Sequence, residues 1–378
     1  MAKKTKQIKN SEPKPHMDTQ LLVITLILVV FGLIMMFSAS YANAYYMYDD
    51  SFRYIKNQAV YAVIGVIAML VISRINYSIL HKFAWIIMAV SYALLVITLF
   101  MPELNNARRW IFIGSFTFQP SEIVKFAVIV LFSHLISIRP NKMGEFKYGF
   151  LQFMVILGMI AAIMMQQTHL SGTIIIGLIG CVMMFIGGTR VKWFALTAGI
   201  AAPLGVALIL VTEKMGYAMD RINIWLNPMT DITDKGHQTY QSLLAIGSGG
   251  LMGLGIGNSR QKHLYVPEPQ NDFIFSIICE ELGFIGALFV IALFMMFIFR
   301  GFSIALNAQN KFGAMLSIGI TAQVGLQALL NIAVVSNTVP NTGISLPFFS
   351  QGGTSLVILL AQIGVMLSVS RFSSVQKL

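Results

Sequence analysis

The amino-acid sequence predicts an all-α, polytopic integral membrane protein with about ten transmembrane helices and both termini in the cytoplasm. Of the 378 residues, 56% are hydrophobic and only 11% are charged, and the mean hydropathy is +0.75. Apolar runs near ~20 residues recur along the chain, and each is long enough to cross about 30 Å of hydrocarbon. Backbone polar groups in lipid must be satisfied within their own segment, so these runs are expected to be helices.

The predicted spans share low charge and a length that suits a bilayer. They cover residues 21–40, 55–73, 79–100, 121–138, 148–166, 173–188, 191–211, 272–299, 312–335 and 346–369. The sixth run is short, and both full and partial crossing are compatible with it. The spans define a single transmembrane domain at residues 21–371. A basic cytoplasmic tail (1–20) precedes it, a short cytoplasmic tail (372–378) follows it, and an extracellular loop (212–271) interrupts it.

Basic residues set the predicted orientation. Most of the 26 Lys and Arg residues fall in the N-terminal tail and in the connections on its side, which the positive-inside rule places in the cytoplasm. The net charge of +11 is therefore mostly a topology signal, and because the basic residues are scattered we expect no nucleic-acid binding. The polar, glycine- and proline-rich segments then fall outside, at 101–120, 166–172, 212–271 and 336–347. This asymmetry predicts a functional site on the outer face.

The segment 106–114 is amphipathic and places Arg108 and Arg109 beside Trp110. It is typical of an interfacial helix or turn with an aromatic anchor. It is equally typical of a phosphate clamp, because guanidinium groups bind phosphate oxygens in a bidentate manner. The pattern alone leaves both interpretations open.

The fourth span opens with Pro120 and Glu122, and Lys125 follows one turn later. Proline suits the first turn of a helix, and a carboxylate suits its positive N-terminal end. Glu122 and Lys125 are spaced i, i+3, so they share a face and can pair. The pair either neutralises itself structurally or faces a wet cavity, as ionisable residues within spans usually do.

Residues 264–275 carry a lone aspartate, Asp272, where a proline-bounded polar loop runs into a long apolar segment. Asp272, Ser276 and Glu280 are spaced i, i+4, i+8, which predicts one cavity-lining helical face with Glu280 about 12 Å deeper. The alternative for Asp272 is a helix-start carboxylate that interacts with free backbone N–H groups. The alternative for Glu280 is a structural hydrogen bond.

Two further features favour structural interpretations. The glycine-dense run 247–257 predicts tight turns against the membrane surface, since glycine adopts positive φ without cost. His169, His237 and His263 lie outside without ligand spacing, so a dedicated zinc site is not expected.

A series of motifs follows along the chain at residues 107–111, 119–122 with Lys125, 167–173, 241–250, 267–275 with 280–283, and 340–348 with Ser350, Gly352 and Gly353. In this order they resemble the SEDS (shape, elongation, division and sporulation) family of bacterial membrane proteins along nearly the whole chain. Residues 257–262 and the Asn271-Asp272 pair resemble the FtsW/SpoVE branch more than the RodA branch. Two positions depart from the family: Thr168 and His169 replace a usual proline and aspartate, and Gln351 replaces a common tyrosine. We leave these positions out of the predicted catalytic set.

The resemblance implies a peptidoglycan glycosyltransferase in the bacterial cytoplasmic membrane. Such an enzyme polymerises lipid II, a disaccharide-pentapeptide on undecaprenyl pyrophosphate, on the outer face. It works with a class B penicillin-binding protein, the transpeptidase that cross-links the product, and with other divisome or elongasome proteins. Whether the chain serves division, sporulation or elongation is left open by the sequence.

The predicted chemistry needs few groups. A lipid pyrophosphate leaves as a stabilised anion, so one base and cationic stabilisation suffice. We expect Asp272 to deprotonate the acceptor 4-hydroxyl. Arg108 or Arg109 and Lys125 are expected to hold the pyrophosphate, with or without a divalent cation (Mg²⁺ or Mn²⁺), and Glu122 to hold Lys125.

Two other functions fit a polytopic bundle with intramembrane charges. A lipid II flippase is the main alternative, although the sequence shows neither repeated halves nor paired broken helices. A non-catalytic scaffold for a division complex is the other. A flippase predicts lipid crossing without polymer, and a scaffold predicts neither.

Overall fold

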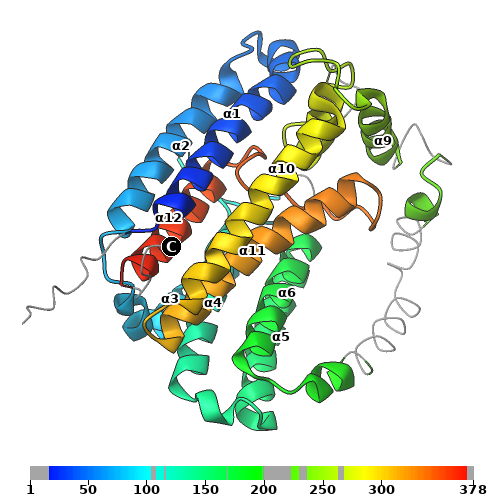
Figure 1. Ribbon diagram of the computed structural model, residues 1–378. Helices are drawn as coiled ribbons and strands as arrows, with labels where there is room; N and C mark the ends of the chain where they lie inside the picture. The colour runs from blue at the N-terminus through cyan, green and yellow to red at the C-terminus, as the bar shows by residue number, and fades with distance from the viewer. Residues whose placement is uncertain are drawn as a thin grey trace, which may run out of the picture.

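The computed structural model is a multi-pass helical bundle (Figure 1). It describes residues 17–372 apart from 104–107, 115, 168, 198, 200–222, 230–235 and 263–267. Within the described residues, nine helices are long and apolar enough to cross a membrane. They confirm the all-α membrane fold, and the short sixth span is among them. The seventh predicted span, 191–211, lies largely outside the described residues, and the orientation of the termini stays a prediction.

The spanning helices are α1 (Thr19–Tyr48), α2 (Arg53–Ile72), α3 (Ser78–Thr98), α4 (Pro120–Ile138), α5 (Gln152–Gln166), α6 (Leu170–Gly187), α10 (Ile274–Leu306), α11 (Lys311–Val335) and α12 (Gly353–Arg371). A π-helical turn, Phe146–Leu151, runs directly into α5, and a 3₁₀ turn covers Pro140–Lys142. The helix α9 (His237–Gly249) is shorter and lies beside α10 (Figure 1).

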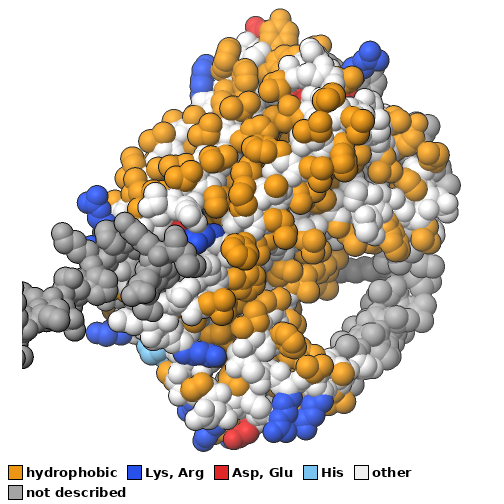
Figure 2. All heavy atoms as spheres, in the orientation of Figure 1, with side chains coloured by type: hydrophobic (Ala, Val, Ile, Leu, Met, Phe, Trp, Pro, Cys, Tyr) orange, Lys and Arg blue, Asp and Glu red, His pale blue; other side chains and the backbone are white. Residues whose placement is uncertain are grey.

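Close helix packing and an apolar outer surface fit the bundle to a membrane. The helix α12 packs on α2, where a Cβ on Gly364 would lie 2.6 Å from the carbonyl oxygen of Met69, so only glycine permits this approach. Side chains such as Val30, Val63 and Phe289 are about half exposed, as lipid-facing residues are in the absence of lipid. Figure 2 shows hydrophobic side chains across one face of the bundle, with Lys and Arg mostly around its margin.

Of the interfacial helix or turn predicted at 106–114, the described residues form a turn, as part of a small β-hairpin. Strand β1 (Ile111–Ile113) pairs antiparallel with β2 (Phe116–Phe118). The β-branched and aromatic residues of both strands favour extended backbone, and Gly114 supplies a φ of 60° in the turn. The hairpin leads directly into Pro120, the first residue of α4.

The helix α10 differs from its predicted span in two ways. It begins at Ile274, so Asp272 lies in the turn before the helix rather than in its first turn. It is also interrupted at Gly283, where φ is 65° and ψ is −164°. The first part of α10 is therefore a short helical segment that ends at the break.

The glycine-rich loop docks into this break. Leu254 N–H donates to Glu280 O (2.9 Å), Gly255 N–H donates to Glu281 O (2.9 Å), and Phe284 N–H donates to the loop in return. These bonds satisfy the backbone groups that the break frees, which is a requirement at membrane depth. The predicted tight turns are confirmed by positive φ angles at residues 250, 253, 255 and 257.

Candidate functional site

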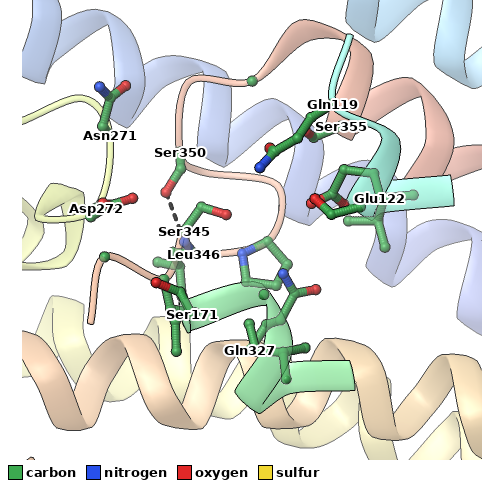
Figure 3. A pocket seen from close by; sticks show the side chains of 18 of the residues that line it. Gln119, Glu122, Ser171, Asn271, Asp272, Gln327, Ser345, Leu346, Ser350 and Ser355 are labelled. Carbon is green, nitrogen blue, oxygen red and sulfur yellow. Dashed lines mark hydrogen bonds between the residues drawn. The ribbon is translucent and has the colours of Figure 1, made fainter. Parts of the chain in front are cut away.

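A polar cavity of about 360 Å³ forms where the first turns of α4, α6 and α12 meet the turn before α10 (Figure 3). Each helix N-terminus carries a partial positive charge, so their convergence favours an anionic ligand. Gln323 and Gln327 of α11 and the segment 343–352 complete the wall. The cavity contains Arg109, Lys125, Glu122 and Asp272, four of the five residues predicted to bind or react with the substrate.

Asp272 is held in its turn by its backbone. The Nδ2 of Asn331 donates both to Asp272 O (2.7 Å) and to Ile344 O (2.6 Å), and Asn331 is fully buried. The carboxylate lies against Gly343, where an added Cβ would be 3.0 Å from Oδ2. In Figure 3 the Asp272 side chain points toward the 345–350 segment across the pocket.

The surroundings of Asp272 raise the pKa of its carboxyl group, which makes the carboxylate a stronger base. Burial, and then the negative charge of Glu268, raise the pKa of Asp272 to about 6, while the Arg109 guanidinium opposes this rise. A carboxyl group with a pKa near 6 is ionised at neutral pH but holds a proton better than an ordinary aspartate. General bases are most effective when their pKa lies near the working pH.

Lys125 and Glu122 form the ion pair that their spacing predicts. The Nζ–Oε1 distance is 2.8 Å, and the side chains are only 4% and 14% exposed. Pro120 occupies the first turn of α4 and Glu122 is its acidic first-turn residue, both as predicted. The pair places a buried ammonium group in the wall of the cavity.

Only one of the two adjacent arginines reaches the cavity. Arg109 lines it, whereas Arg108 is about half exposed and pairs with Glu103 (3.1 Å). Arg108 also donates to the carbonyl oxygen of Leu99 (3.0 Å). The two adjacent side chains therefore lie in different surroundings, and only Arg109 belongs to the cavity.

The prediction that Ser276 and Glu280 line the cavity is wrong. Ser276 donates to Phe273 O (2.7 Å), and Glu280 is 1% exposed and accepts from Arg260 N–H (2.9 Å) and the Ser259 hydroxyl. The helical spacing from Asp272 does not hold, because Asp272 precedes the helix. The structure therefore supports the alternative, in which Glu280 makes structural hydrogen bonds.

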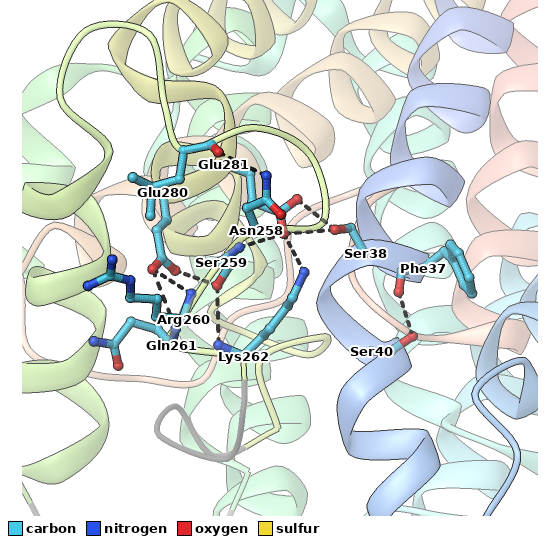
Figure 4. Close-up of polar contacts among 11 residues, drawn as sticks. Phe37, Ser38, Ser40, Asn258, Ser259, Arg260, Gln261, Lys262, Glu280 and Glu281 are labelled. Atoms are coloured by element: carbon cyan, nitrogen blue, oxygen red, sulfur yellow. Dashed lines mark hydrogen bonds and ion pairs between the residues drawn. The ribbon is translucent and has the colours of Figure 1, made fainter.

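Glu280 belongs instead to a buried polar network, together with Glu281, Lys262 and Ser38 (Figure 4). Lys262 Nζ lies 2.8 Å from Glu281 Oε1, and both side chains are 0% exposed. The Ser38 hydroxyl of α1 donates to the same carboxylate at 2.8 Å and 2.6 Å. Through these hydrogen bonds and this ion pair, the network connects the loop 250–262 to α1 and to the first part of α10.

The sequence reasoning missed several cavity residues. His169 and Gln351, set aside as departures from the family, both line the cavity, while Thr168 lies outside the described residues. Gln323 and Gln327 were also missed, although two amides in the apolar helix α11 are a signal that a polar surface is nearby.

Comparison with known proteins identifies the family. The FtsW/RodA/SpoVE family, described as cell cycle proteins, matches residues 19–375. The chain belongs to this family. It is 41% identical to stage V sporulation protein E of Bacillus subtilis, covering 95% of this chain and 98% of that protein. It is 38% identical to the probable peptidoglycan glycosyltransferase FtsW of Geobacter sp. (strain M18), covering 93% of this chain and 96% of that protein.

Solved structures show the same fold as this FtsW/RodA/SpoVE protein. One, described as "Structural coordination of polymerization and crosslinking by a peptidoglycan synthase complex", has a TM-score of 0.78 at 24% identity and covers 95% of this chain and 98% of that one. The crystal structure of rod shape determining protein RodA of Thermus thermophilus has a TM-score of 0.70 at 23% identity and covers 95% and 98%.

The described part of this family member offers no preformed metal centre. It contains no group of three or more His, Cys, Asp or Glu residues that would hold a metal ion. Of the acidic residues in the cavity, Glu122 is paired with Lys125, and Glu268 accepts from Asn271 Nδ2 (2.7 Å). Among the described cavity residues, positive charge comes from Arg109 and Lys125.

Proposed function

We propose that this protein is a peptidoglycan glycosyltransferase that polymerises lipid II on the outer face of the bacterial cytoplasmic membrane. The observation that carries the proposal is one cavity that combines Asp272, with its pKa near 6, and two cationic side chains, Arg109 and Lys125. Relatives 35–38% identical over most of the chain are named probable peptidoglycan glycosyltransferases, which supports the same activity here.

The cavity residues have two roles in the reaction: one acts as the general base, and the others bind the anionic leaving group. Asp272 accepts the proton of the acceptor 4-hydroxyl as that oxygen attacks the anomeric carbon of the donor. The bond from that carbon to the pyrophosphate breaks, and the pyrophosphate leaves with the electron pair. Arg109 and Lys125 stabilise the charge that develops on it, so no general acid is needed. Direct displacement without a covalent intermediate inverts the anomeric centre.

The remaining groups position these residues. Glu122 holds the Lys125 ammonium at 2.8 Å, and Asn331 holds the turn that carries Asp272. The predicted Mg²⁺ or Mn²⁺ stays a prediction, and its place would be on the substrate's pyrophosphate. A class B penicillin-binding protein as partner is supported by the fold shared with a chain of a peptidoglycan synthase complex.

The test is polymerisation of labelled lipid II by the purified protein, alone and with its class B partner. Asp272→Asn is compared with Asp50→Asn, which removes an exposed carboxylate paired with Lys56. We expect polymer from the wild type and from Asp50→Asn, and none from Asp272→Asn that elutes as a folded protein. Equal polymer from all three would remove Asp272 as the base.

The flippase and scaffold alternatives give different results. No polymer from the wild type with its partner, together with transfer of labelled lipid II across vesicle membranes, would establish a flippase. If neither polymer nor lipid transfer is observed, the non-catalytic scaffold is the remaining function.

A further inference from the structure

His169 lies in the wall of the cavity, in the turn between α5 and α6, and is only 8% exposed. Its Nε2 is 3.0 Å from Gln119 Nε2 and 3.3 Å from the Ser121 hydroxyl. The Gln119 amide is placed with its nitrogen toward the ring, and an amide nitrogen can only donate, so in this arrangement His169 Nε2 accepts and carries no proton. The neutral ring therefore bears its proton on Nδ1.

The ring is kept neutral by its surroundings. Burial, and then the positive charges of Arg109 and Lys125, lower the pKa of His169 to about 3. Gly172 packs against the ring, since an added Cβ there would lie 2.6 Å from Nε2. The imidazole is thus an oriented hydrogen-bonding group without charge.

The Nδ1–H donor has no hydrogen-bond partner among the described residues. Buried donors are nearly always paired, and an unpaired one costs about 1–3 kcal/mol. Nδ1 itself is buried, and the His169 side chain lines the same cavity as Arg109 and Lys125. An anion bound by these cations therefore brings acceptor oxygens to the wall of the cavity that contains the ring.

We propose that His169 Nδ1–H donates a hydrogen bond to a pyrophosphate oxygen of the lipid-linked substrate, as a neutral third donor beside Arg109 and Lys125. This inference rests on the proposed function and names a residue that contacts the substrate. A neutral donor adds orientation without a third positive charge, so it contributes less than a cation to retention of the product pyrophosphate.

Two matched variants separate this role from a structural one. An asparagine amide can place its N–H near the position of Nδ1, whereas a glutamine oxygen can reach the position of Nε2. His169→Asn therefore keeps the substrate donor and loses the acceptor for Gln119, and His169→Gln does the reverse. The readouts are the Kd for undecaprenyl pyrophosphate in nanodiscs and the apparent Tm.

We expect His169→Gln to weaken undecaprenyl pyrophosphate binding about tenfold, the effect of one lost hydrogen bond to a charged group, with little change in Tm. His169→Asn should keep wild-type affinity and lower the Tm. The reverse pattern, or wild-type affinity in His169→Gln, would overturn the proposal and leave His169 as a bridge between α4 and α6.

A measurement on the wild type does not depend on either variant folding. In ¹⁵N-histidine NMR spectra, a protonated Nδ1 signal should shift when undecaprenyl pyrophosphate is added, and a histidine spectrum unchanged at saturation would contradict the contact. Lipid II polymerisation is assayed in parallel. Binding that follows the expected pattern without any polymer would refute the glycosyltransferase and keep the His169 contact.

Discussion

Replacing Lys262 by methionine should release the loop 250–262 from α10. Lys262 Nζ pairs with Glu281 Oε1 at 2.8 Å, and both side chains are 0% exposed. The ammonium also lies 4.6 Å from the centre of the Tyr41 ring on α1. The Lys262→Met variant removes the positive charge while keeping a long apolar stem, so Glu281 is left as a buried carboxylate.

The expected cost follows from that burial. Removing one partner of a buried ion pair typically costs about 3–5 kcal/mol. Glu281 keeps the Ser38 hydroxyl and, at 3.4 Å, Ser259 N–H, so we expect the lower end, about 3 kcal/mol. By contrast, Lys56 and Asp50 are 66% and 41% exposed, and such surface pairs contribute about 0–1 kcal/mol.

Limited proteolysis of the detergent-solubilised protein measures this opening. A loss of about 3 kcal/mol raises the open population of the loop roughly 100-fold, and cleavage within 250–262 should accelerate accordingly. Lys56→Met is the control and should be cleaved at the wild-type rate. Adding Glu281→Leu to Lys262→Met should restore most of the protection, because no charge is then left unpaired. Cleavage of Lys262→Met at the rate of Lys56→Met would refute the reasoning.

Two further predictions concern the cavity. Asp272 acts as a base only when it is deprotonated, and its pKa is about 6. We therefore expect kcat/KM to be level above pH 7 and to fall about tenfold per pH unit well below pH 6. A kcat/KM that stays level down to pH 5 would contradict this prediction. Lys125→Met should lower kcat about 10²-fold in the lipid II assay, because it removes a cation that stabilises the leaving group. Glu122→Gln keeps this cation and should lower kcat less. Equal losses of kcat in the two variants would contradict the prediction.

The features that the sequence predicted well depend on neighbouring residues. Pro120 in the first turn of α4 and the Glu122–Lys125 pair follow from helix-end preferences and from the i, i+3 spacing. Spans are predictable for a similar reason, because the bilayer imposes length and apolarity on each segment separately. Neither inference requires knowledge of how distant segments pack.

The errors arose where distant segments decide the structure. Asp272 was placed in a helix because the apolar run continues through it, but Asn331 of α11 holds this turn outside α10. Glu280 was assigned to the cavity by helical spacing, whereas the loop at 259–261 surrounds its carboxylate. Only the tertiary contacts show which side chains line the same cavity.

The charge balance around Asp272 links substrate binding to base strength. The Arg109 guanidinium is the group that lowers the pKa of Asp272, against burial and Glu268, which raise it. A pyrophosphate bound to Arg109 offsets that positive charge and adds negative charge nearby, so the pKa of Asp272 must rise when the donor binds. The pH profile of kcat, which reports the enzyme–substrate complex, should therefore have a higher midpoint than that of kcat/KM, which reports the free enzyme. Coincident midpoints would show that the pyrophosphate does not bind at Arg109.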